Sequence, residues 1–238
     1  MLKLKAMKIF KFILPLLFFV MINDIKAQDS TETSPFLYGA DIVSRYIFRG
    51  LDYGDSPAIQ PAFSFTKKGF TIGAWGSYAF IATPTGIEAD IYASYAFDFG
   101  LSVGVTDYYF PGEMLTINPD STISPVRKGT YFDYANTHYN ELNVSQSIGN
   151  LDLSGNWGFH NMDNAVYFEA GYTFKWISAF LGAGNKIYTT NGKFNVVNLG
   201  IKATKEINIT PKYAFGISSS VIFNPEAEQI HLVFALSL

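Results

Sequence analysis

The feature that most constrains this chain is a series of roughly ten-residue segments in which apolar residues alternate with small or polar ones. The clearest of them, residues 70–80, has apolar side chains at positions of one parity: Phe70, Ile72, Ala74, Tyr78 and Phe80. A strand sends successive side chains to opposite faces of its sheet. Each segment therefore predicts a strand with one apolar face and one polar face.

About twelve such strands are expected in the chain. Their approximate ranges are 36–48, 57–66, 70–80, 87–97, 100–109, 138–148, 151–160, 164–174, 177–187, 194–204, 211–223 and 229–238. Pro61 interrupts the second of them. Because proline cannot donate a ladder hydrogen bond, we expect a bulge at Pro61 or a strand that starts after it.

The connections between these segments alternate in length. Four are tight turns: Lys67-Lys68-Gly69, Asp98-Phe99, Gly149-Asn150 and Lys175-Trp176. Most of the others are longer and polar, and the longest is residues 111–137, whose conformation the sequence leaves open. Short turns at one end and long loops at the other are typical of an antiparallel barrel that crosses a membrane. The predicted fold class is therefore all-β: an up-and-down transmembrane β-barrel of about 12 strands.

The N-terminus predicts export. Four lysines precede the apolar stretch 12–22, which is too short for a transmembrane helix, and Ile25-Lys26-Ala27 fits a cleavage site. A retained signal anchor is the alternative, which Pro15 disfavours. We therefore expect a signal peptide at 1–27, a polar leader at 28–35, and an outer-membrane barrel at 36–238 carrying the long loop 111–137.

Charge and cysteine usage exclude several functions. Removal of residues 1–27 takes away five of the 17 Lys and Arg residues and one of the 20 Asp and Glu residues, which leaves a net charge of −7. Nucleic acids select basic surfaces, so no nucleic acid partner is expected. The absence of cysteine excludes thiol catalysis and Cys-ligated zinc.

Two folds could use the alternation. In a soluble sandwich or lipocalin-like barrel the apolar faces point inward, whereas in a membrane barrel they point outward. The polar faces are rich in Gly, Ser, Ala and Thr, and charged residues are only 16% of the chain. A soluble surface is about 25–35% charged. The composition therefore favours a water-filled lumen and a lipid-facing exterior.

Two stretches near the first strands carry a family resemblance. They read Val43-Ser44-Arg45-Tyr46-Ile47-Phe48-Arg49-Gly50 and Ser56-Pro57-Ala58-Ile59-Gln60-Pro61, and Gly73-Ala74-Trp75-Gly76-Ser77 follows. This opening resembles that of the TorF-type porins over about residues 40–97, although Pro61 stands where relatives tend to have Gly. The chain also ends on Leu238, where barrels of this kind often end on an aromatic residue. The resemblance implies an outer-membrane barrel with porin-like transport, and it carries over no catalytic or substrate-binding residues.

Charged residues on the polar faces are the candidate lining of a pore. The acidic ones are Asp41, Glu88, Asp90, Glu141, Asp152 and Glu169, and the basic ones are Arg45, Arg49, Lys186 and Lys202. Rows of opposite charge facing across a wet lumen select solutes. The alternative is that these residues pair and fill the lumen. Twelve strands lie between the eight of a filled barrel and the sixteen of an open one, so both a narrow channel and a closed barrel are compatible with the sequence.

The sequence therefore predicts a porin-like channel for passive diffusion of small hydrophilic solutes across the outer membrane. The expected partners are the lipid bilayer, the barrel-assembly machinery and those solutes. No nucleotide-binding fingerprint or nucleophile elbow occurs, and the three histidines are scattered. We therefore expect no enzyme activity, no cofactor and no metal. The alternative function is a non-transporting structural or surface-binding barrel that acts through its extracellular loops.

Overall fold

A computed structural model describes residues 34–81, 87–111, 113–117, 123–128, 130–210 and 213–238. The expected signal peptide (1–27) and most of the expected leader (28–35) lie outside these residues. Within the described part of the chain, no helix has the length and apolar character needed to cross a membrane.

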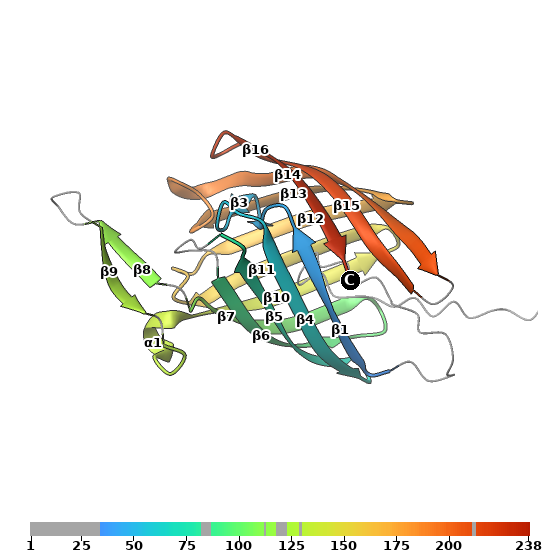
Figure 1. Cartoon of the computed structure of the whole chain (residues 1–238), viewed down its shortest axis with the longest axis horizontal. Helices are drawn as coiled ribbons and strands as arrows, with labels where there is room; N and C mark the ends of the chain where they lie inside the picture. The colour runs from blue at the N-terminus through green and yellow to red at the C-terminus, as the bar shows by residue number, and fades with distance from the viewer. Residues whose placement is uncertain (1–33, 82–86, 112, 118–122, 129, 211–212) are drawn as a thin grey trace, which may run out of the picture.

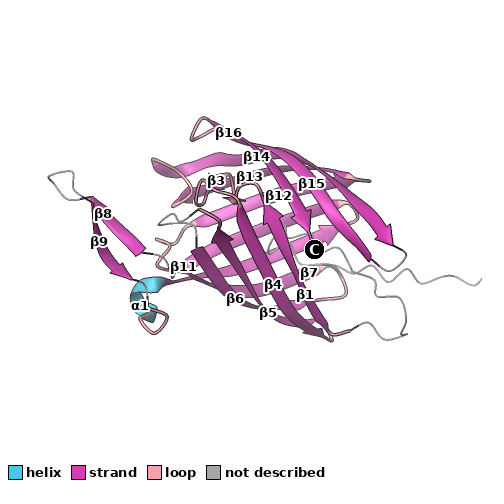
Figure 2. Cartoon of the chain, viewed as in Figure 1, coloured by secondary structure: helices cyan, strands magenta, loops and turns pink. Residues whose placement is uncertain are grey.

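Twelve antiparallel strands close into a barrel, which confirms the predicted fold class (Figures 1 and 2). The barrel strands are β1 (Phe36–Val43), β4 (Ala58–Lys67), β5 (Phe70–Ala79), β6 (Ile87–Ala96), β7 (Leu101–Tyr109), β10 (His138–Ile148), β11 (Leu151–His160), β12 (Val166–Phe174), β13 (Ile177–Lys186), β14 (Gly192–Thr210), β15 (Tyr213–Asn224) and β16 (Gln229–Ser237). The chain runs up and down around the wall, and β1 closes it by pairing with β16 on one side and β4 on the other.

The tight turns gather at one end of the barrel, as the sequence predicts. Lys68-Gly69 joins β4 to β5 with both residues at positive φ, and Gly149-Asn150 joins β10 to β11. Such two-residue turns match the twist of the strands that they connect. β1 begins and β16 ends at this same end. We call it the turn end, and the opposite end the loop end.

The apolar and polar faces are reversed relative to a soluble protein. The side chains shielded inside the barrel are mostly polar, among them Gln60, Ser77, Thr106, Asn143, Asn156 and Asn198. The exposed outer side chains are mostly large and apolar, and the clearest are Ile72, Leu181, Leu199, Ile201, Leu232 and Phe234. The alternation therefore places its apolar rows on the exterior, as predicted for a barrel in a membrane.

Outward aromatic side chains lie at both ends of the strands. Near the turn end the exposed ones include Phe70, Tyr95, Phe97, Tyr172, Phe174 and Trp176. Near the loop end they include Tyr78, Phe80, Trp157, Phe159, Phe168 and Phe223. The wall thus has an aliphatic middle between two aromatic rows.

The expectation of a bulge or a late start at Pro61 is wrong. β4 runs through Pro61, which pairs with Ala40 of β1 in an unbroken register. The ladder to β5 lacks pairs at Gln60 and Pro61, but its register is the same on both sides of the gap. The proline is accommodated by two omitted pairs and not by an extra residue.

The described parts of the long segment 111–137 lie outside the barrel. It contains a two-stranded sheet formed by β8 (Glu113–Ile117) and β9 (Ile123–Lys128), followed by the short helix α1 (Tyr134–Thr137). Figure 1 shows the β8–β9 hairpin projecting away from the barrel wall at the loop end. The β8–β9 hairpin therefore does not fold into the mouth of the barrel.

Candidate functional site

A different loop enters the lumen. The predicted first strand, 36–48, is wrong beyond Val43, where β1 ends. The chain then turns inward through β2 (Ile47–Phe48) and β3 (Leu51–Asp52), which pair only with each other. We call residues 44–57 the lumen hairpin. Its turn residues Arg49 and Gly50 both have positive φ, at 52° and 80°, which is the geometry of a two-residue hairpin turn.

The tip of the lumen hairpin contacts two strands of the wall that the hairpin does not connect. Gly50 accepts a hydrogen bond from Nδ2 of Asn224 on β15, at 3.1 Å. A Cβ atom on Gly50 would lie 1.9 Å from the carbonyl oxygen of Val197 on β14. Only glycine fits so close an approach at a positive φ. The tip is therefore docked against β14 and β15, which are separated from β1 by β16.

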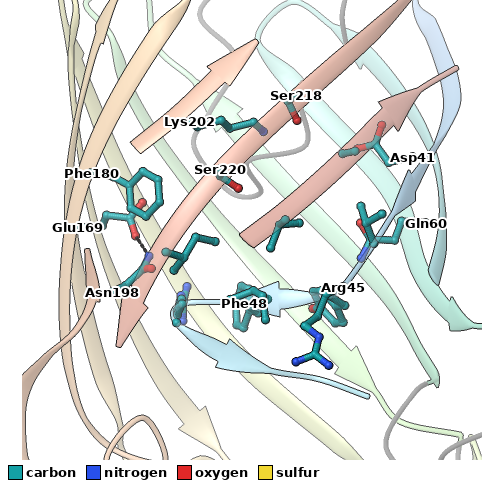
Figure 3. A pocket seen from close by; sticks show the side chains of 18 of the residues that line it. Asp41, Arg45, Phe48, Gln60, Glu169, Phe180, Asn198, Lys202, Ser218 and Ser220 are labelled. Carbon is teal, nitrogen blue, oxygen red and sulfur yellow. Dashed lines mark hydrogen bonds between the residues drawn. The ribbon is translucent and has the colours of Figure 1, made fainter. Parts of the chain in front are cut away.

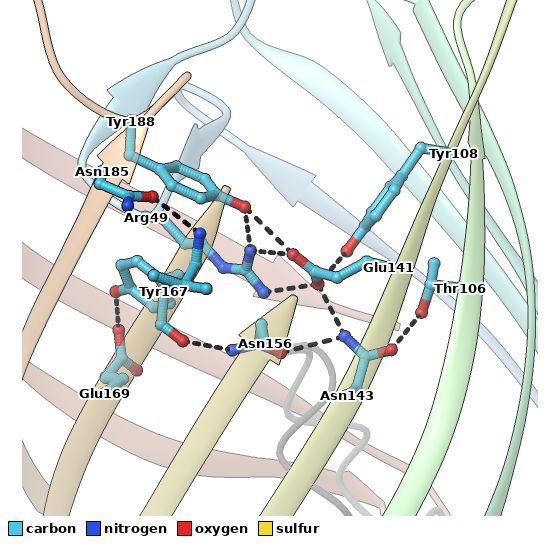
Figure 4. A network of polar contacts seen from close by, with 11 residues as sticks. Arg49, Thr106, Tyr108, Glu141, Asn143, Asn156, Tyr167, Glu169, Asn185 and Tyr188 are labelled. Atoms are coloured by element: carbon cyan, nitrogen blue, oxygen red, sulfur yellow. Dashed lines mark hydrogen bonds and ion pairs between the residues drawn. The ribbon is translucent and has the colours of Figure 1, made fainter. Parts of the chain in front are cut away.

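Arg49 forms a two-point ion pair with Glu141 of β10 (Figure 4). Its Nη1 and Nη2 atoms donate to the two carboxylate oxygens at 2.6 and 2.8 Å. The side chains are 8% and 1% exposed. The guanidinium carbon also lies 4.5 Å from the ring centre of Tyr167, a cation–π distance. A planar, bidentate arrangement of this kind is specific to arginine.

Further donors surround the same carboxylate. Tyr108 and Tyr188 donate their hydroxyls to Glu141 at 2.9 and 3.1 Å, and Asn143 donates its amide at 2.6 Å. Burial disfavours the charge on Arg49, but the facing carboxylate favours it, and the pKa of this guanidinium lies above its ordinary value. Buried charges persist only when paired and hydrogen-bonded, and here both partners are. We call Arg49 and Glu141 the latch.

Aromatic rings pack along the rest of the lumen hairpin. The ring of Tyr46 lies 5.4 Å from that of Trp75 on β5, and the ring of Phe48 lies 6.2 Å from that of Tyr108 on β7. Phe48 and Leu51 also pack against the buried apolar cluster formed by Tyr108, Met162, Ala165, Tyr167, Tyr188 and Val197. The apolar core of this protein thus lies inside the barrel, around a hairpin that crosses it.

A cavity remains between the lumen hairpin and the turn end (Figure 3). Its volume is about 200 Å³. Polar side chains from several strands line it, among them Asp41, Gln60, Asn156, Glu169, Asn198 and Lys202. The hairpin itself supplies Arg45, Tyr46, Phe48 and Arg49 to the lining. We call this cavity the chamber; the lumen hairpin forms one side of it, and strands of the wall supply both its polar residues and apolar ones such as Val43, Ile222 and Val233.

The candidate pore-lining residues fall into four groups. Asp41, Glu169 and Lys202 line the chamber from strands, and Glu169 accepts a hydrogen bond from Asn198 at 2.8 Å. Glu141 and Arg49 form the latch. Asp152 lies on β11 near the turn end, where Ser147 donates to it at 2.5 Å. Glu88 and Asp90 are buried on β6, at 4% and 2% exposure, and not on an open surface.

Three of the candidate residues lie elsewhere than expected. Lys186 lies at the loop-end rim and not deep in the lumen: its side chain is 42% exposed and pairs with Asp163 at 3.1 Å. Arg45 and Arg49 do not project from a barrel strand, because the chain has already turned inward. Arg45 instead pairs with Asp52 at 2.9 Å, and also contacts Asp55, within the lumen hairpin.

Sequence reasoning missed the partners of the latch. Tyr108, Tyr167 and Tyr188 were not among the candidates, although Tyr108 lies on the polar face of its strand. The one local signal for the inward turn is the Arg49-Gly50 pair followed by Gly54, because glycines mark turns. This signal competes with an alternation that continues to Phe48.

Comparisons with known proteins give a family and two solved structures. The family model described as "Bacterial protein of unknown function (Gcw_chp)" matches residues 27–207. A KdgM porin matches with a TM-score of 0.45 and 10% identity, over 84% of this chain and 96% of that chain. A KdgM porin in complex with disordered oligogalacturonate matches with a TM-score of 0.41 and 10% identity, over 84% and 95%. No curated protein matches the sequence.

Proposed function

Because the chain belongs to the Gcw_chp family of bacterial proteins of unknown function, we propose its function from the barrel itself: it is an outer-membrane channel for passive diffusion of small hydrophilic solutes. The observation that carries this proposal is the reversed polarity of the wall. An exterior of exposed Ile, Leu, Val and Phe around a polar interior is stable only where hydrocarbon replaces water outside.

The dimensions of the wall support a membrane location. β5, β6, β11 and β13 each have ten residues, and a transmembrane strand needs about 9–11 residues when tilted. Aromatic rows at both ends correspond to the two belts that flank the apolar band of such barrels. The proposal includes a location in a bacterial outer membrane, export by the N-terminal signal and insertion by the barrel-assembly machinery. The resemblance to TorF-type porins is consistent with it.

The polar chamber supports transport of small solutes. Its lining includes carboxylates, amides, hydroxyls and cationic side chains as well as apolar ones, so a hydrophilic molecule meets hydrogen-bonding groups there. The lumen hairpin narrows the path before the chamber, which limits solutes to small ones. Permeation needs no bond to be made or broken, and we propose that the protein is not an enzyme.

Planar-bilayer recording on the purified, refolded chain tests the channel. We expect discrete conductance steps in potassium chloride, small because the lumen hairpin occupies part of the lumen. The absence of steps at every salt concentration and voltage would contradict the proposal.

The second candidate is a non-transporting barrel that binds a partner through its loops. The hairpin across the lumen and the projecting β8–β9 hairpin favour it. It predicts that a barrel without steps in the bilayer still inserts fully into vesicles, and that vesicle swelling assays with small sugars and amino acids show no uptake.

A further inference from the structure

One edge of the barrel wall is left open beside the lumen hairpin. β16 pairs with β1 only from Ala235 to Ser237, with flanking backbone bonds at Phe234 and Leu238. The rest of β16, back to Gln229, extends past the end of β1. In an antiparallel strand, the backbone amide and carbonyl of one residue point to the same neighbouring strand, and those of every second residue point the same way. Because Phe234 directs its carbonyl to Ser44, Ile230 and Leu232 direct their backbone groups to this same open side.

These groups have no partner on that side within the described residues. In the described residues, neither Ile230 nor Leu232 has a backbone hydrogen bond on that side of β16. Their side chains point outward and are 61% and 58% exposed, as expected for lipid contact. An unsatisfied amide or carbonyl facing hydrocarbon is costly. A free edge at this position therefore favours the addition of a strand.

The sequence of the lumen hairpin matches that edge. The register that pairs Val43 with Ala235 and bonds Ser44 to Phe234 would, if continued, pair Tyr46 with Leu232 and Phe48 with Ile230. Tyr46 and Phe48 would then face outward in line with Tyr38 and Ile42, and Arg45 would face the lumen. The same alternation of outward and inward residues predicts the strand at 36–48. That alternation fits an extension of β1 along β16, which the chain does not form in this structure.

The lumen hairpin is a separate two-stranded unit with its own backbone pairs. Its internal pairs, Ile47 with Asp52 and Phe48 with Leu51, enclose the Arg49-Gly50 turn and make no ladder with the barrel. On the β4 side, its junction with the wall contains Gly54 and Asp55 at positive φ, 111° and 45°. On the β1 side the junction is Ser44 and Arg45. Rotation at these two junctions would carry the hairpin out of the lumen without breaking its own pairs.

We propose that the lumen hairpin is a gate with two positions. In the docked position, seen here, the latch and Gly50 hold it across the lumen. In the zipped position residues 44–48 extend β1 along the free edge of β16, and the lumen is open. The inference rests on the proposed channel function, but the movement is measurable without any transport. Movement from the docked to the zipped position breaks the latch and forms backbone hydrogen bonds between residues 44–48 and β16. Glu141 is then exposed to water in the lumen.

Engineered cysteine pairs distinguish the two positions, because the chain has no cysteine of its own. In Y46C/L232C the two residues lie on opposite sides of the wall when the hairpin is docked: Tyr46 packs on Trp75 inside, and Leu232 faces outward. In the zipped position they are cross-strand partners, with Cα atoms about 5.5 Å apart, which is within disulfide reach. F48C/I230C tests the same register two residues further on, if the first variant folds poorly.

The matched control is I42C/L236C, a pair of the same type that the structure already joins. Each protein is reconstituted in phosphatidylcholine vesicles, treated with a mild oxidant, and analysed by mass spectrometry. We expect disulfide in the control and in Y46C/L232C, and little in the out-of-register pair Y46C/I230C. Disulfide in the control together with its absence in both in-register test pairs would overturn the gate.

Conductance separates failure of the gate from failure of the channel. The oxidised Y46C/L232C protein should conduct several-fold more than its reduced form. Disulfide formation without conductance in either form would keep the gate as a movement and contradict the channel function. Conductance of the unmodified chain with no test disulfide would keep the channel and overturn the gate.

Discussion

Removing the arginine of the latch should open the lumen. In R49A the carboxylate of Glu141, which is 1% exposed, loses its ion pair with Arg49 while the hairpin stays docked. Loss of one partner from a buried ion pair costs about 3–5 kcal/mol. Tyr108, Tyr188 and Asn143 still donate to Glu141, so we take the low end, about 3 kcal/mol. At about 1.4 kcal/mol per tenfold change, the docked position loses roughly 100-fold in population relative to the alternatives.

The assay is single-channel recording on R49A beside the unmodified protein. We expect longer open times and a larger mean conductance. The double variant R49A/E141Q should restore part of the closed time, because no carboxylate is then left without its cation. The control is K186A, whose ion pair with Asp163 is exposed at the rim and should be nearly neutral. Traces of R49A that match those of the unmodified protein in conductance and dwell time would refute the latch.

Three further predictions follow from the same contacts. G50A should open the channel much as R49A does, because the added Cβ would overlap the carbonyl of Val197. G192A is the control: Gly192 also has a positive φ but has open space around it, so histograms of closed times should change for G50A and not for G192A. I201K puts a charge on the outward middle of β14 and should lower the free energy of unfolding by about 2–4 kcal/mol, measured by urea unfolding from vesicles. S154K, whose side chain lies inside the barrel beside Glu169, should lower it far less, and equal decreases would contradict the assigned faces. Deletion of 113–128 should leave the unfolding midpoint and the conductance unchanged, because β8 and β9 pair only with each other; a large shift in either would show that this hairpin supports the barrel.

The fold is largely readable from the sequence because nearly every strand alternates between an exposed apolar face and a shielded polar one. The ranges predicted for 138–148 and 151–160 coincide with β10 and β11. β14 is longer than predicted, since residues 205–210 pair with β15 and do not form a turn. Residues 205–210 show no marked alternation of apolar and polar side chains, and they include Lys205 and Glu206. The sequence therefore does not indicate a strand there, although backbone pairing with β15 extends β14 through them.

The candidate site was less predictable, because it depends on which loop folds inward. Arg49 and Glu141 are 92 residues apart in the chain, and nothing local indicates that they meet. Alternation identifies which residues face a lumen, and so placed Asp41, Glu169 and Lys202 correctly on its wall. It does not distinguish a residue on a wall from one on a hairpin that continues the same pattern, and this is why Arg45 and Arg49 were assigned to a strand.

The central claim is that the outward apolar rows contact hydrocarbon, and three tryptophans test it directly. Trp157 and Trp176 are exposed on the exterior, whereas Trp75 is buried inside the barrel. Variants that keep one tryptophan each, with the others changed to phenylalanine, are reconstituted in vesicles with brominated acyl chains. We predict strong fluorescence quenching of Trp157 and Trp176 and little of Trp75. Quenching of Trp75 as strong as that of the other two, or a folded protein that stays in the supernatant when the vesicles are sedimented, would contradict the account.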